Sequence, residues 1–75
     1  MDLNELLKKE CPLYDDCEIG IVYYFDTAVI VVYENEITIE CPNYMEEDEW
    51  DNPIVFTYSR ENAPMDLITR VIYGV

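Results

Sequence analysis

EIGIVYYFDTAVIVVYENEITIEC, the stretch at residues 18–41, places apolar side chains at alternate positions along three short segments. A period of two predicts β-strands, here at residues 18–25, 28–33 and 36–41. Asp26-Thr27 and Glu34-Asn35 are left between them as two-residue turns, and asparagine suits the second turn because it tolerates a positive φ. The first turn is predicted from its length alone. The stretch therefore predicts a three-stranded antiparallel meander.

Two-residue turns fix the cross-strand register, because the residues that flank each turn face one another. One face of the meander is then almost wholly apolar and is predicted to be core: Ile19, Ile21, Tyr23, Phe25, Ala28, Ile30, Val32, Ile37, Ile39 and Cys41. The other face, called here the outer face, collects Glu18, Gly20, Val22, Tyr24, Val29, Val31, Tyr33, Glu36, Thr38 and Glu40. Its valines and tyrosines make it too apolar for a plain solvent face. We expect a helix of the same chain or a second copy to cover part of it, in preference to a foreign partner.

The flanking segments predict two helices and a further strand. Residues 2–10 form a short amphipathic helix capped by Asp2 and stopped by Pro12. Residues 54–59 alternate like a fourth strand, and a last helix is capped by Asn62 and ended by Gly74. Its buried stripe is Leu67, Ile68, Val71 and Ile72. The predicted fold is α+β, a single domain over residues 1–75 with an antiparallel β-meander of three to four strands between an N-terminal and a C-terminal helix.

Charge is the strongest functional signal. The chain has 17 Asp and Glu against 4 Lys and Arg, a net charge of −13, and no basic residue between Lys9 and Arg60. The acidic residues are most concentrated in the segment called here the acidic run, Glu46-Glu47-Asp48-Glu49-Trp50-Asp51. Because 51% of the residues are apolar or aromatic, the composition is not that of a disordered chain. Such a negative field predicts a basic protein partner, and it would repel both nucleic acid and an anionic membrane.

The usual components of an active site are missing from the sequence. There is no histidine, Ser59 is the only serine, and Gly20 and Gly74 are the only glycines, which excludes triad chemistry and phosphate-cradling loops. Cys11, Cys17 and Cys41 lack zinc-ligand or redox spacing, and the acidic run lacks the pattern of an EF-hand. We expect neither an enzyme nor a bound cofactor or metal. Reduced thiols, with no export signal or membrane span, predict a cytoplasmic protein.

Two groups of residues are candidate partner contacts. Glu36 and Glu40 on the outer face and the acids of the run, Glu46, Glu47, Asp48, Glu49 and Asp51, can present carboxylates where a nucleic acid presents phosphates. Trp50 and Tyr44, with Met45, can add apolar anchors beside them. Packing of Trp50 onto the core is the alternative. The second group, Val22, Tyr24, Val29, Val31 and Tyr33, is a candidate dimer or partner face.

In size, charge, reduced thiols and helix–strand–helix order, the chain resembles the small acidic DNA-mimic inhibitors encoded by phages, of the anti-CRISPR or uracil-DNA glycosylase inhibitor type. The resemblance is one of class, and no site residue is transferred from it. It implies an inert protein that blocks a CRISPR effector, nuclease or DNA glycosylase in the host cytosol. An immunity protein or antitoxin that neutralises a basic toxin is one alternative, and a homodimeric structural or assembly protein is the other.

Overall fold

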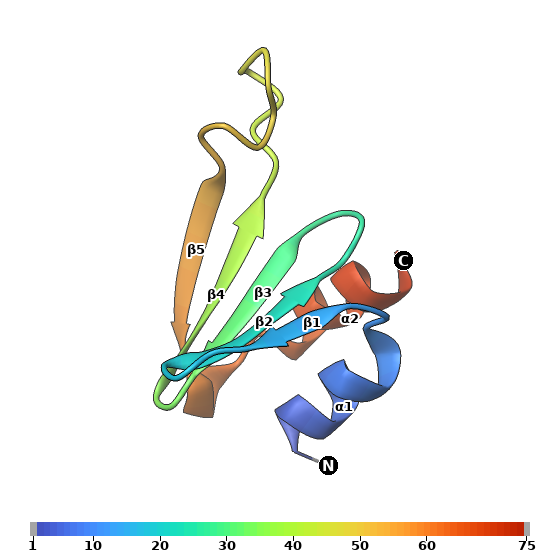
Figure 1. Cartoon of the computed structure of the whole chain (residues 1–75), viewed down its shortest axis with the longest axis vertical. Helices are drawn as coiled ribbons and strands as arrows, with labels where there is room; N and C mark the ends of the chain where they lie inside the picture. Colours follow the sequence, from blue (N-terminus) through green and yellow to red (C-terminus); the bar gives the residue numbers. More distant parts are fainter. Residues whose placement is uncertain (1, 75) are drawn as a thin grey trace.

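The computed structural model describes residues 2–74 and consists of an antiparallel sheet with two helices on one side (Figure 1). The sheet has five strands in the order β1-β2-β3-β4-β5, so each strand pairs with its neighbours in the sequence. The elements are α1 (Leu3–Glu10), β1 (Tyr14–Asp16), β2 (Gly20–Tyr24), β3 (Val29–Tyr33), β4 (Glu36–Cys41), β5 (Ile54–Ser59), a 3-10 turn (Arg60–Asn62) and α2 (Met65–Tyr73). The α+β meander is thus confirmed, with five strands instead of three to four.

The central register is the one that the alternation predicts. Tyr23 lies opposite Ile30, and Ile30 lies opposite Ile39, so the apolar residues of three strands share one face. The turn at Asp26-Thr27 is closed by the Phe25 N–H, which donates to the Ala28 carbonyl at 3.0 Å. Within residues 2–74 no residue other than Gly74 has a positive φ, so the turn at Asn35 does not use the conformation for which asparagine was favoured.

Strand β1 is the strand that the sequence did not predict. Its three residues include Asp15 and Asp16 and show no alternation of apolar side chains. Because β1 pairs with β2, residues 18 and 19 become a turn between Cys17 and Gly20, whose main chains exchange hydrogen bonds at 2.8 and 3.3 Å. The prediction that Ile19 belongs to the core is therefore wrong, since Ile19 is 75% exposed at this turn.

Both helices cover the same face of the sheet, where the core lies. Leu7 of α1 and Ile68 of α2 are fully buried against the apolar residues of β2, β3 and β4. The remaining members of the buried cluster are Cys11, Tyr23, Ala28, Ile30, Val32, Ile37 and Ile39. Ile21, Phe25 and Cys41 are partly buried at its margin, as are Leu67, Val71 and Ile72 of the predicted helical stripe. No helix within residues 2–74 lies over the outer face (Figure 1).

Close packing within the sheet explains the glycine at position 20. A Cβ there would lie 2.5 Å from the carbonyl oxygen of Val32, which is main chain and cannot move aside. Glycine therefore permits the approach of β2 and β3 at this point. Gly74 ends α2, as the sequence predicts. Its φ is 70°, and its N–H donates to the Arg70 carbonyl at 2.7 Å.

The helix starts differ from the prediction. Asn62 lies in the 3-10 turn, and Pro64 occupies the N-cap position of α2, so the predicted cap at Asn62 is wrong. Asp2 does stand at the N-cap of α1, but its carboxylate makes no capping hydrogen bond. Its Oδ1 instead lies 3.6 Å from the guanidinium of Arg60. Arg60 also donates to the carbonyls of Tyr33 and Glu34, at 3.2 and 3.4 Å, so it joins the N-terminus to the β3–β4 turn.

The hairpin of β4 and β5 extends beyond the helices. The molecule measures 37 × 27 × 23 Å, and the hairpin and its loop form one end of the long axis (Figure 1). Ile54 and Phe56 share the helix-side face with Cys41 and Ile39 in the register, yet both are close to half exposed because neither α1 nor α2 reaches this end of the sheet (Figure 1).

Candidate partner-binding surface

The loop between β4 and β5, residues 42–53, is held together by Asn43. The Asn43 main-chain N–H donates to the Glu49 carbonyl at 2.7 Å, and its own carbonyl accepts the Glu46 N–H at 3.1 Å. The side chain closes the base of the loop: Oδ1 accepts the Met45 N–H and Nδ2 donates to the Asn52 carbonyl, both at 3.1 Å. Asparagine suits this role because its short side chain can replace main-chain partners in a turn.

Asp48 has a structural role at the tip in addition to its predicted contact role. Its Oδ1 accepts the Trp50 N–H at 3.1 Å, and its main-chain carbonyl accepts the Asp51 N–H at 3.0 Å. The acidic run is therefore a folded turn, and all six of its residues are exposed. Neither Asn43 nor this bond was predicted, although an Asn or Asp two residues before a main-chain donor is the signature that could have identified both.

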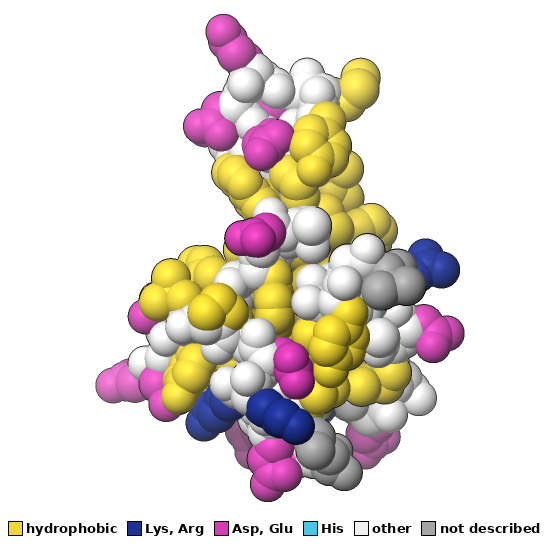
Figure 2. Space-filling view, turned by 90° about the vertical axis from the view of Figure 1, so that its right-hand side faces the viewer, with side chains coloured by type: hydrophobic (Ala, Val, Ile, Leu, Met, Phe, Trp, Pro, Cys, Tyr) yellow, Lys and Arg dark blue, Asp and Glu magenta, His cyan; other side chains and the backbone are white. Residues whose placement is uncertain are grey.

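The apolar residues of the loop differ in how far they reach into solvent. Tyr44 is 78% exposed and Met45 is 94% exposed, whereas Trp50 is 38% exposed. The indole is thus partly covered, but Trp50 does not pack against the buried cluster, so the alternative of packing onto the core is wrong. Figure 2 views the helix side and shows apolar side chains continuing from the body into the projecting hairpin, with acidic side chains at its end.

The predicted acids of β4 do not form a single group with the loop. Glu40 lies on the outer face between Val29 and Val55 and is half-buried, near the end of β4 that leads into the loop. Glu36 is exposed at the opposite end of β4, about 13 Å away along the strand. Thr38 separates the two, so the row of carboxylates is interrupted. The structure brings Glu40 close to the base of the loop and leaves Glu36 beside the β3–β4 turn.

The loop acids lack local counter-charges. The ion pair of Arg60 with Asp2 is the one salt bridge within residues 2–74, and it lies at the other end of β5 from the loop. Lys8 stacks over the Tyr14 ring at 5.7 Å, on the body of the molecule. Unpaired carboxylates on a projecting loop produce a local negative potential that salt can screen but no neighbouring side chain cancels.

The outer face offers a second, mostly apolar surface. Val31 is almost buried there, while Val22, Val29 and Tyr33 are partly exposed and Tyr24 is exposed. Because no helix within residues 2–74 covers this face, neighbouring side chains of the sheet account for this burial. Next to Gly20, the side chains of Cys17, Val22, Val31 and Tyr33 line an apolar hollow of about 110 Å³. Tyr24 donates its hydroxyl to Asp15 Oδ2 at 3.1 Å, and this hydrogen bond raises the pKa of Tyr24.

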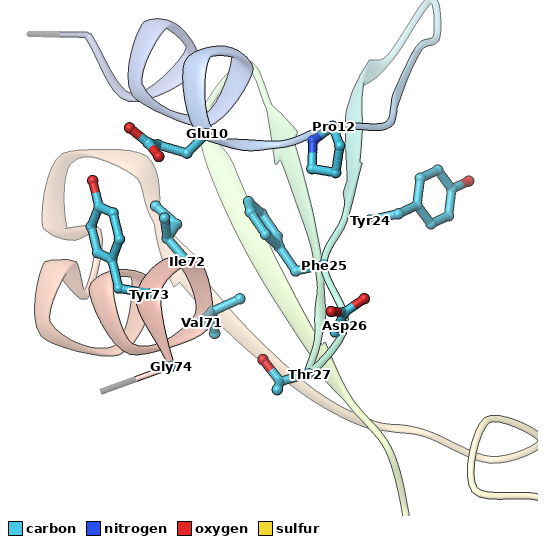
Figure 3. A pocket seen from close by; sticks show the side chains of 10 residues that line it. All are labelled: Glu10, Pro12, Tyr24, Phe25, Asp26, Thr27, Val71, Ile72, Tyr73 and Gly74. Atoms are coloured by element: carbon cyan, nitrogen blue, oxygen red, sulfur yellow. The ribbon is translucent and has the colours of Figure 1, made fainter.

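A different hollow, of about 330 Å³, lies between the C-terminal ends of both helices and the β2–β3 turn (Figure 3). Phe25, Val71 and Ile72 form its apolar wall, and Glu10 and Asp26 stand at its margin. Tyr24 points to the opposite side of the sheet from Phe25. The lining includes no Lys, Arg or Cys side chain, and it shares no residue with the acidic run.

The three thiols are free and separate: Cys11 is buried, Cys17 is exposed and Cys41 is half-buried. Among residues 2–74 there is no cluster of three or more metal-ligating side chains. Neither helix in this part of the chain has the length and apolar character needed to cross a bilayer. No protein-family model, curated protein or solved structure matches the chain. Functional assignment therefore depends on the surfaces described above.

Proposed function

We propose that this protein is a catalytically inert inhibitor that binds a nucleic-acid-binding enzyme in the cytosol, with its carboxylates in place of nucleic-acid phosphates. A CRISPR effector, a nuclease or a DNA glycosylase is the class of target. The projecting loop carries the proposal: five carboxylates and three apolar side chains stand at one end of the molecule, organised by main-chain hydrogen bonds and free of local cations. A basic groove that normally holds a phosphate backbone is complementary to this loop.

The two kinds of side chain have different tasks in this proposal. The carboxylates of the acidic run steer the loop toward a basic groove and pair with Lys and Arg there, so association is fast and weakens with salt. Tyr44, Met45 and Trp50 contribute apolar contacts that a nucleic acid does not make, and such anchors carry most of the affinity of protein interfaces. Glu40, near the base of the loop, extends the acidic surface onto the sheet.

The test begins with the target. The purified protein is used as bait in bacterial lysate, bound proteins are eluted with a salt gradient, and mass spectrometry identifies them. We expect a nucleic-acid enzyme that moderate salt or competing DNA releases. Capture of a basic toxin instead would indicate that the protein is an immunity protein that uses the same surface. An eluate without any cationic protein would contradict the proposal.

Two charge-matched variants of this protein then show which of its surfaces binds the identified target. The first replaces the five acids of the run by Gln and Asn, which keeps an acceptor at position 48 for the Trp50 N–H. The second neutralises five exposed acids on the body: Glu5, Glu18, Asp26, Glu61 and Asp66. We expect the loop variant to lose affinity by about a hundredfold and the body variant by less than about threefold, because close charge pairs outweigh long-range attraction. Equal losses would mean that net charge alone drives binding.

A further inference from the structure

The two edges of the sheet differ in how they are protected. Strand β1, at one edge, is three residues long and carries Asp15 and Asp16, which are features that discourage pairing with another strand. Strand β5, at the other edge, has six residues without a charge, a proline or a glycine. Within residues 2–74 no other strand or helix lies along the free side of β5 (Figure 1). One edge is therefore blocked, and the other is open to a further strand.

The direction in which each β5 residue forms its main-chain hydrogen bonds follows from the bond just beyond the end of the strand. The Arg60 N–H donates to the Asn35 carbonyl at 3.0 Å, in continuation of the β4–β5 register. Because bonding direction alternates along an antiparallel strand, Tyr58, Phe56 and Ile54 direct their N–H and C=O groups toward β4. Val55, Thr57 and Ser59 then direct theirs away from the sheet, and all three residues are exposed. The free edge presents alternating donors and acceptors to solvent.

We propose that β5 pairs with β5 of a second copy of this chain, antiparallel and centred on Thr57, so that two five-stranded sheets become one. A two-fold axis at Thr57 places Val55 opposite Ser59 of the other copy and allows about six main-chain hydrogen bonds. On the helix side, Phe56 lies across from Tyr58 of the other copy, an aromatic pair at a position where Phe56 is close to half exposed in the single chain.

This geometry limits the charge repulsion between two copies. Each chain carries −13, so most ways of bringing two copies together are repulsive, but β5 itself is uncharged. The antiparallel arrangement sends the two acidic loops to opposite ends of the joined sheet. Arg60 and Glu61, whose charges cancel, approach the base of the other copy's loop. Six residues a side is well below the roughly 20 to 30 of a standard interface, so the dimer should exist in a concentration-dependent equilibrium with the monomer.

The decisive measurement is sedimentation velocity over a range of protein concentrations, at about 0.1 M and about 1 M NaCl, between which the screening length falls from ~10 Å to ~3 Å. We expect a dimer fraction that rises with concentration and also with salt, because salt screens the repulsion between the copies. This salt dependence is opposite in sign to that of the cationic partner in the proposed function, so either proposal can fail alone. A wild-type protein that stays monomeric under all these conditions overturns the β5 pairing.

Three variants locate the interface. Thr57→Pro removes a main-chain donor that points away from β4, so the sheet of the single chain keeps its bonds. Thr57→Lys places a charge on the edge, and Thr27→Lys makes the same change at the exposed β2–β3 turn as the matched control. We expect both Thr57 variants to weaken dimerisation by about tenfold or more. Each dimer of Thr57→Pro loses two main-chain hydrogen bonds, and each dimer of Thr57→Lys places two positive charges opposite one another. Thr27→Lys should resemble the wild type.

Amide exchange followed by NMR provides an independent readout on the wild type. The N–H groups of Val55, Thr57 and Ser59 should become protected only at concentrations where the dimer forms, while those of Phe56 and Tyr58 are protected throughout. If Thr57→Pro does not fold, Thr57→Lys decides the question. A dimer that survives Thr57→Lys but dissociates in Val31→Lys uses the outer face, and this result would exclude the β5 pairing.

Discussion

At the scale of single residues, the buried hydroxyl of Tyr23 shows how the core accommodates a polar atom. Tyr23 lies beneath α1 and donates its hydroxyl to Asn4 Oδ1 at 2.8 Å. Burial raises its pKa from 10.0 to about 12, and Asp16 adds to the shift. Because the folded protein holds this proton more tightly than the unfolded chain does, the contribution to stability is complete below pH 10 and is lost as the pH rises toward 12.

The pH dependence of stability tests this assignment. Between pH 10 and pH 12 the free energy of unfolding should fall by up to about 1.4 kcal/mol per pH unit through Tyr23, and Tyr23→Phe should remove that part of the slope. Urea unfolding at a series of pH values measures it. Tyr44→Phe, at an exposed tyrosine, is the control and should keep the wild-type slope. An unchanged slope in Tyr23→Phe would contradict the assignment.

At the scale of elements, the acidic loop is separable from the body, since Asn43 organises it through contacts that lie outside the core. Asn43→Ala should therefore lower the free energy of unfolding by less than about 1 kcal/mol, because the lost bonds are exposed to water. The Met45 amide should nevertheless exchange faster, and affinity for the proposed target should fall. Asn52→Ala, in the same loop, keeps the carbonyl that Asn43 contacts and should behave as wild type. Parallel measurements of unfolding and binding would separate the two effects.

The elements also show what the sequence can and cannot predict. Alternation and short turns determined the pairing of β2, β3 and β4, because a shift of one residue would expose the apolar face. Strand β1 has no alternation, so nothing in its three residues distinguishes it from a loop. Because β1 was not predicted, Ile19 was assigned to the core, whereas it is exposed at the turn between β1 and β2. The start of α2 was misjudged because Asn62 and Pro64 are both acceptable first-turn residues.

For the candidate surfaces, the residue types were predictable and their arrangement was not. The acidic run stands out in the sequence by charge alone, but the projection of its hairpin depends on how far the helices reach along the sheet. Placement of both helices on one face is likewise a property of the packed chain, and it leaves the Val22 and Val31 side of the sheet uncovered. The open edge at β5 became recognisable only when the strand order was known.

At the scale of the whole molecule, unbalanced charge should limit stability. The chain has seventeen acidic and four basic residues, and within residues 2–74 the one ion pair between them, Arg60 with Asp2, is half exposed. Screening should therefore stabilise the fold: from about 0.1 M to about 1 M NaCl we expect the Tm to rise by roughly 4 to 8 °C, equivalent to about 1 kcal/mol. Thermal unfolding followed by circular dichroism measures the change. Dilute Thr57→Pro is the control that excludes dimerisation, and a Tm that is independent of salt would contradict the expectation.

The projecting hairpin also has an evolutionary consequence. Its loop closes on its own main chain through Asn43 and adds nothing to the buried cluster, so substitutions among the acidic residues escape the constraints that packing imposes on the body. Under the proposed function, a lineage that follows a changing target can alter the tip repeatedly while Leu7, Ile30 and Ile68 stay the same. Related chains should then diverge fastest at residues 44–51 and slowest at the positions beneath the two helices.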